Sequence, residues 1–170
     1  MTSLDEQTTL LGNTKQDYAS ILRWMSFANS EILPTLGGWF NPLIGRRPYN
    51  KQEVEEGMTG TLQRMEILEK HLGKSNSTSN ESLYLVGGQL SIADLFVAGV
   101  LAGGFMFFFD EAWRKEHRAV TRWFEHISAQ PILADVAGKP VMVEKAIPNA
   151  PPQKRKEIKS EEATHKLQQA

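Results

Sequence analysis

Residues 90–109, LSIADLFVAGVLAGGFMFFF, pair a well-defined helix start with the longest apolar run of the chain. Ser91 and Asp94 have the spacing of a capping box, in which each side chain bonds the other residue's backbone amide, and we assign them this structural role. Leu90 and Leu95 are placed as the accompanying hydrophobic staple. Because the run is uncharged after Asp94 but short for a bilayer, we expect a helix buried on all sides in a soluble domain.

Two glycines in this run, Gly99 and Gly103, are four residues apart and therefore share one face of the expected helix. A face of small residues lets a neighbouring helix approach closely. We therefore expect tight helix packing against this face.

Composition excludes several classes of site. The chain has 170 residues, of which 41% are apolar and 23% charged, which suits one globular domain with a core. A net charge of −1 argues against nucleic acid or an anionic membrane as a direct partner. The absence of cysteine excludes disulfides and thiolate chemistry, and four histidines without ligand spacing predict no metal site. The N-terminus lacks the features of a signal peptide, so we expect a cytoplasmic protein.

Helical periodicity continues on both sides of the central run. Pro34 is expected to divide the first helix, Gly37 and Gly38 to bend the chain, and Asn50 to cap the second helix. No strand-rich region is evident, so the predicted fold class is all-α. The helices outside the central run are predicted over residues 14–36, 50–72, 117–129 and 132–136.

The order of these parts resembles the C-terminal helical domain of the glutathione transferase superfamily. The resemblance rests on LSIAD at residues 90–94, on Arg122-Trp123-Phe124 and on Pro131, and it covers roughly residues 10–138. It implies an all-α, glutathione S-transferase C-terminal-like helical bundle, followed by a disordered tail. The corresponding parts are a residual interdomain segment, the helical domain, and a Pro-rich then charged flexible tail, at residues 1–13, 14–138 and 139–170.

Three shorter stretches resemble the gamma subunit of the translation elongation factor one B complex, with fungal sequences closest. These are LLGNT at residues 10–14, ILRWMSFANSE at 21–31 and KPVMVEKA at 139–146. Fungi also use gamma-like transferases as accessory enzymes in secondary metabolism. The resemblance therefore implies either a transferase or a translation scaffold.

Members of the superfamily begin with a thioredoxin-like domain that binds glutathione and activates its thiol. No thioredoxin-like domain is found in this chain. We therefore expect glutathione as cosubstrate, and transferase activity, only if such a half is present or is supplied by another chain. The resemblance further implies a homodimer or a pairing with another transferase-like chain.

In this family the helical domain contributes the pocket for a hydrophobic electrophile, from the middle of its first helix and the end of its central helix. The alternative interpretation is that the phenylalanines in these positions are plain core and that the asparagine is simply solvated. The positions that match are Met25, Asn29, Ser30, Phe105, Phe108 and Phe109.

Three functions remain open from the sequence. The first is glutathione conjugation or isomerisation of a hydrophobic electrophile, as an accessory enzyme of fungal secondary metabolism. The alternative is an elongation factor gamma-like scaffold that docks nucleotide-exchange subunits. The third is a degenerate protein with a purely structural role.

Overall fold

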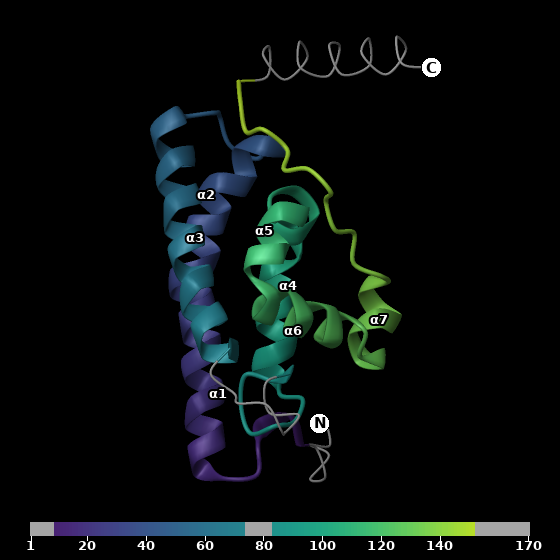
Figure 1. The fold of residues 1–170 in the computed structure, drawn as a ribbon. Helices are drawn as coiled ribbons and strands as arrows, with labels where there is room; N and C mark the ends of the chain where they lie inside the picture. The colour runs from purple at the N-terminus through teal and green to yellow at the C-terminus, as the bar shows by residue number, and fades with distance from the viewer. Residues whose placement is uncertain (1–8, 74–82, 152–170) are drawn as a thin grey trace, which may run out of the picture.

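The computed structural model describes residues 9–73 and 83–151. Within these ranges the α-helices follow one another without any strand, which confirms the predicted all-α class (Figure 1). In chain order they are α1 (Lys15–Phe27), α2 (Leu33–Leu43), α3 (Lys51–Gly73), α4 (Ile92–Phe107), α5 (Glu111–Glu116), α6 (Arg118–Ser128) and α7 (Pro131–Ala137).

The first two helices form a nearly continuous rod, joined by a π-helical turn at Ala28–Ile32 (Figure 1). Pro34 lies in the first turn of α2, directly after the π-helical turn, whose last amide, that of Leu33, donates to the Ala28 carbonyl five residues earlier. The expected bend at Gly37 and Gly38 is wrong, because both glycines lie inside α2. Tertiary packing against α3 keeps this glycine-containing segment helical.

Glycines of α3 bring α2 and α3 into close contact. A Cβ atom on Gly57 would lie 2.7 Å from the Trp39 amide nitrogen and 2.8 Å from the Thr35 carbonyl oxygen. A Cβ atom on Gly60 would lie 2.7 Å from the Thr35 Cγ2 atom. Only glycine therefore permits the observed distance between these two helices.

Helix α4 contacts α1, α2 and α6, and its N-terminal cap is deeply buried. Ser91 and Asp94 form a capping box, and Asp94 is 0% exposed. Its Oδ2 accepts from the Ser91 amide at 3.0 Å and the Ser91 hydroxyl at 2.6 Å. Its Oδ1 accepts from the Leu85 amide at 2.8 Å and from the Trp123 indole nitrogen at 2.9 Å. One carboxylate thus joins α4, the preceding loop and α6.

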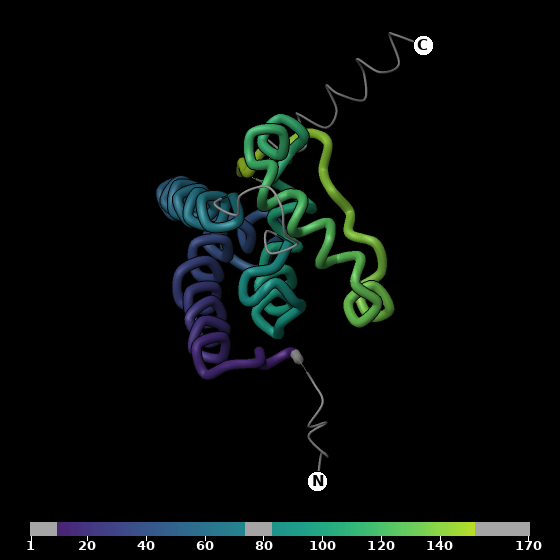
Figure 2. Tube along the Cα trace, turned by 60° about the horizontal axis from the view of Figure 1, so that its bottom comes forward, coloured from purple at the N-terminus to yellow at the C-terminus, as the bar shows by residue number. Residues whose placement is uncertain are grey.

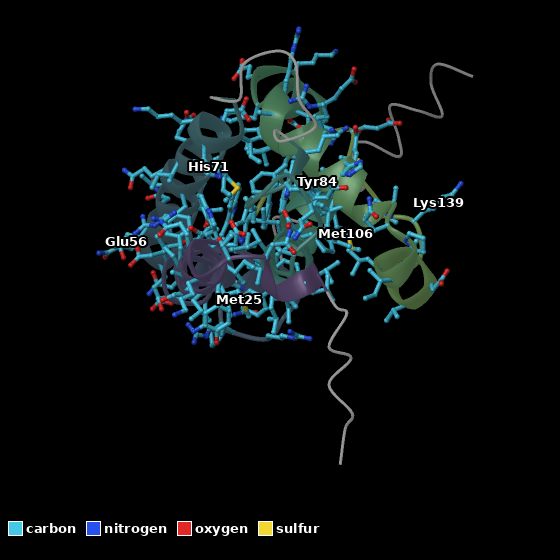
Figure 3. The ribbon with its side chains drawn as sticks, turned by 90° about the horizontal axis from the view of Figure 1, so that it is seen from below. Met25, Glu56, His71, Tyr84, Met106 and Lys139 are labelled. Carbon is cyan, nitrogen blue, oxygen red and sulfur yellow. The ribbon has the colours of Figure 1, made fainter. Side chains whose placement is uncertain are left out.

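The view along the bundle in Figure 3 shows side chains filling the space between the helices. His71 of α3 is labelled there, and its Nε2 donates to the Leu85 carbonyl at 3.0 Å. Tyr84 stands in the same loop, where its hydroxyl lies 3.0 Å from the His126 Nε2 of α6. The loop before α4 is therefore tied to helices on two sides.

After α7 the chain turns back as an extended C-terminal arm, residues 138–151, which follows the outside of the bundle (Figures 1 and 2). The Val143 amide donates to the Phe105 carbonyl at 3.0 Å, and the Ile147 amide donates to the Phe107 carbonyl at 2.8 Å. The last carbonyls of a helix lack partners within the helix. The arm supplies partners to two such carbonyls of α4.

All three segments of the predicted domain division are only partly covered by the described residues, and residues 74–82 of the helical domain lie outside them. Residues 1–8 of the residual interdomain segment lie outside them, as do residues 152–170 of the predicted tail.

Candidate functional site

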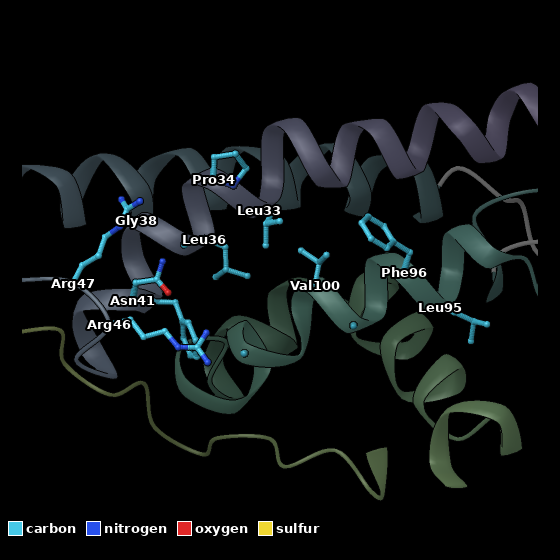
Figure 4. A pocket seen from close by; sticks show the side chains of 14 residues that line it. Leu33, Pro34, Leu36, Gly38, Asn41, Arg46, Arg47, Leu95, Phe96 and Val100 are labelled. Atoms are coloured by element: carbon cyan, nitrogen blue, oxygen red, sulfur yellow. The ribbon is translucent and has the colours of Figure 1, made fainter. Parts of the chain in front are cut away.

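A groove of about 820 Å³ runs between α2 and α4 (Figure 4). Its walls come from α2, from the loop that follows α2 and from the first three turns of α4. The fourteen residues that line it are Leu33, Pro34, Leu36, Gly37, Gly38, Phe40, Asn41, Arg46, Arg47, Leu95, Phe96, Gly99, Val100 and Gly103.

The walls of the groove are apolar. Leu33 and Leu36 of α2 point toward Val100 of α4 across the gap, and Phe96 extends the same wall (Figure 4). Leu33 is 46% exposed, so a large aliphatic side chain faces open space here. Contiguous exposed apolar surface of this kind is typical of ligand or partner sites.

One face of α4 is open, so the expectation of a helix buried on all sides is wrong. A Cβ atom built on Gly99 would meet no heavy atom within 4 Å, and Met106 is 40% exposed. The close contact at Gly103 is with the ring of Phe40, 3.3 Å from a built Cβ atom. Gly99 therefore leaves open space in the groove, and Gly103 makes room for the Phe40 ring instead of a helix backbone.

Two arginines, Arg46 and Arg47, stand at one end of the groove. Gly45 turns the chain after α2 with a φ of +78°, a conformation that favours glycine, and the Arg46 amide donates to the Asn41 carbonyl at 2.9 Å. In Figure 4 the Arg46 side chain extends over the gap between α2 and α4. The turn thus delivers two cationic side chains to an otherwise apolar site.

The three phenylalanines predicted for the pocket lie in the core. Phe105 and Phe109 are 0% exposed and Phe108 is 4% exposed. Phe105 stacks on Phe124 of α6 with ring centroids 3.8 Å apart, and Phe108 stacks on Trp39 of α2 at 3.9 Å. None of the three lines the groove.

The three candidates from the first helix differ from the phenylalanines in being less buried. Met25 is half-buried and packs against the core, whereas Asn29 and Ser30 are exposed on the π-helical turn. Asn29 stands one turn before Leu33, which places it beside the end of the groove but outside its lining. None of the six predicted residues therefore lines the groove.

The groove residues that the sequence interpretation missed are mainly Leu33, Leu36, Leu95 and Phe96. The helical spacing of these residues is visible in the sequence. Apolar residues at that spacing predict a buried helix face, but they do not show whether a neighbouring helix covers that face or leaves it open. In residues 9–73 and 83–151, no group of three His, Cys, Asp or Glu side chains could hold a metal ion. The same ranges contain no helix long and apolar enough to cross a membrane.

Comparison with known proteins decides the family. The model of the glutathione S-transferase C-terminal domain matches residues 25–131. The chain belongs to this family. The match confirms the family expected from the LSIAD motif and from the residues that follow it.

Relatives in the family include both transferases and an elongation factor. Glutathione S-transferase stcT of Emericella nidulans is 52% identical over 87% of this chain and 66% of its own length. Glutathione S-transferase psoE of Aspergillus fumigatus is 40% identical over 92% of this chain and 64% of its own length. The chain thus spans just under two thirds of the length of these curated relatives.

The fold is also that of a solved relative. The GST-like domain of elongation factor 1-gamma from Saccharomyces cerevisiae superposes with a TM-score of 0.74, at 32% identity, over 89% of this chain and 66% of that one. This protein is therefore glutathione S-transferase-like in sequence and in fold.

Proposed function

We propose that this chain is the helical half of a fungal glutathione transferase, and that the groove between α2 and α4 forms the wall of its site for a hydrophobic electrophile. The single observation that supports this proposal most directly is the open apolar groove, in a chain 52% identical to Glutathione S-transferase stcT. Leu33, Leu36 and Val100 would pack against the apolar body of the electrophile, and the removal of this apolar surface from water would stabilise the complex.

In the family, a thioredoxin-like half holds glutathione and activates its thiol. The helical half contributes proximity, because it holds the electrophile beside the thiolate. We infer that glutathione is the cosubstrate of the whole enzyme, that it works in the cytoplasm, and that it serves a secondary-metabolite pathway. We further infer that the enzyme is a homodimer or pairs with another transferase-like chain.

The experiment joins this chain to the thioredoxin-like half of an active glutathione transferase and measures conjugation of 1-chloro-2,4-dinitrobenzene. We expect turnover by the chimera and none by the 170-residue chain alone, with titration calorimetry of glutathione run on both. A Gly99→Leu chimera, whose new side chain enters open space in the groove, should show a raised KM for the electrophile and an unchanged KM for glutathione. An unchanged KM for both substrates would refute the assignment of the groove.

A second function is supported by the likeness to the GST-like domain of elongation factor 1-gamma, with a TM-score of 0.74. In that case the chain would dock a nucleotide-exchange subunit and need no electrophile. Co-purification of such a subunit from fungal extract, together with an inactive chimera, would favour this scaffold.

A further inference from the structure

The two walls of the groove meet at one end through aromatic rings. The ring of Phe40 in α2 lies over Gly103 of α4, 3.3 Å from a built Cβ atom, and its centroid is 5.4 Å from that of Phe107. One residue earlier in α2, Trp39 stacks on Phe108 with ring centroids 3.9 Å apart. The width of the groove at this end therefore depends on how α2 packs against the end of α4.

The C-terminal arm crosses this junction on the outside of the bundle. In Figure 1 it runs from α7 to the side of the molecule where α2 ends. The Ile147 amide donates to the Phe107 carbonyl of α4 at 2.8 Å. Two residues later, the side-chain amide of Asn149 donates to the Trp39 carbonyl of α2. The end of the arm thus joins the two helices that form the groove.

The preceding part of the arm is anchored by charged side chains at the start of α5. The Arg114 guanidinium donates to the Val143 carbonyl at 2.6 Å, and the Asp110 carboxylate accepts from the Ala146 amide at 3.4 Å. Hydrogen bonds to charged groups are stronger than those between neutral groups. The arm therefore has a firm base at residues 143–146 before it reaches α2.

The contact between Asn149 and α2 is marginal by comparison. The Asn149 Oδ1 atom is buried and has no hydrogen-bond partner among the residues that the structure describes. A buried acceptor without a partner costs free energy, which offsets the contribution of the bond that the same amide donates. When the arm lifts from α2, water can pair both polar atoms of the amide. This end of the arm can therefore open and close while its base stays attached.

We propose that residues 147–151 form a clasp, which holds α2 against α4 at the spacing that fits an apolar ligand, and that Asn149 is a positioning residue of the groove. A closed clasp preorganises the two walls, and a preorganised site binds more tightly because less freedom is lost on binding. By linkage, a ligand between the walls stabilises the closed clasp to the same extent. The inference rests on the proposed function of the groove as a site for hydrophobic molecules and adds a means of regulating it, because an event that draws the arm away from α2 weakens binding.

The test measures both directions of this coupling in the 170-residue chain, with the neutral fluorescent probe N-phenyl-1-naphthylamine. Asn149→Asp keeps the size of the side chain, but a carboxylate cannot donate to the Trp39 carbonyl. It should weaken binding of the probe about two- to tenfold, which corresponds to the net contribution of one hydrogen bond. Val141→Asp is the matched control, since it places the same charge in the arm at a residue that is 63% exposed, and it should leave the affinity unchanged.

Hydrogen exchange followed by NMR tests the opposite direction in the parent chain, without any substitution. Saturating probe should slow exchange of the Ile147 amide by the same factor, about two- to tenfold. The Val143 amide, which donates to the Phe105 carbonyl at the base of the arm, should exchange at the same rate with and without the probe. A contact that merely stabilised the fold would not make one amide of the arm respond to the probe and leave the other unchanged.

The possible results separate the two proposals. Gly99→Leu fills the groove and should weaken the probe, which locates its binding. If the probe binds in the groove but does not slow exchange of the Ile147 amide, the clasp is refuted and the groove remains a site for hydrophobic molecules. The same conclusion follows if folded Asn149→Asp binds the probe like the parent chain, or if Val141→Asp weakens binding equally. If the probe does not bind the parent chain, or if Gly99→Leu changes nothing, the groove is not the binding site and both proposals fail.

Discussion

The fully buried carboxylate of Asp94 and the half-buried carboxylate of Asp17 allow one motif to be tested in two environments. Both belong to capping boxes, with Ser91 and with Thr14. Asp17 is half-buried and accepts from the Asn13 amide at 3.2 Å and from the Thr14 amide at 3.0 Å. Water can replace these bonds when the side chain is removed, so Asp17→Ala should lower the free energy of unfolding by about 1 kcal/mol.

Asp94→Ala removes more than a cap. It also leaves the Leu85 amide and the Trp123 indole nitrogen without their acceptor, in a site from which water is excluded. Each buried donor left unpaired costs about 1–3 kcal/mol, in addition to about 1 kcal/mol for the cap. We therefore expect Asp94→Ala to lower the free energy of unfolding by about 4 kcal/mol, several times the effect of Asp17→Ala.

Two further variants divide the effect of Asp94. Trp123→Phe removes one of the donors to Asp94 and keeps most of the ring. It should therefore lower the free energy of unfolding by an amount between those for Asp17→Ala and Asp94→Ala. Asp94→Asn keeps the size of the side chain but places an amide nitrogen against the two donors of Ser91. It should therefore destabilise the protein, although no large cavity forms.

The assay is urea unfolding followed by far-UV circular dichroism, with the same m-value required of all variants. If Asp17→Ala and Asp94→Ala lower the free energy of unfolding equally, within about 0.5 kcal/mol, the reasoning from burial is wrong. An Asp94→Asn variant as stable as the parent would equally show that the four hydrogen bonds contribute little.

The remaining predictions concern packing, charge and the C-terminal arm. Gly57→Ala should lower the free energy of unfolding by about 2 kcal/mol, because the new Cβ atom would meet backbone atoms of α2. Gly99→Ala should raise the free energy of unfolding by up to about 1 kcal/mol, because its Cβ atom meets no neighbour and alanine favours a helix interior over glycine. Chemical denaturation measures both changes. The hydrogen bond and positive charge of Lys115 lower the pKa of the Glu111 carboxyl in the folded protein. The interaction of Glu111 with Lys115 is therefore fully stabilising above the pKa that Glu111 has in the unfolded chain, and this stabilisation is lost as the pH falls through the pKa that Glu111 has in the folded protein. Lys115→Met should raise the pKa of Glu111 toward its ordinary value in an NMR titration, and an unchanged pKa would contradict the assigned cause. The Arg114 guanidinium donates at 2.6 Å to the Phe109 carbonyl, just after α4, and at 2.6 Å to the Val143 carbonyl of the arm. Arg114→Met should therefore speed hydrogen exchange of the backbone amides in the arm, and unchanged exchange would show that the backbone hydrogen bonds hold the arm alone.

Much of the helical framework could be predicted because its signals are local. Asn50 accepts from the Gln52 and Glu53 amides at 3.0 and 3.3 Å, as its position before an apolar-periodic stretch predicts. A cap and its helix lie within a few residues of each other, so neighbouring residues suffice to specify them. The predicted helices over 50–72 and 117–129 accordingly agree with α3 and α6.

The sequence by itself determined the family and the all-α class, since these depend on short motifs and on helical periodicity. Only the tertiary structure decided which face of each apolar helix is covered. Phe105 and Gly99 lie in the same uncharged run, yet Phe105 stacks in the core while Gly99 faces the groove. The difference is set by α2 and α6, which are distant from α4 in the sequence but contact it in the fold. The residues of the central helix alone do not show which of its sides these two helices cover.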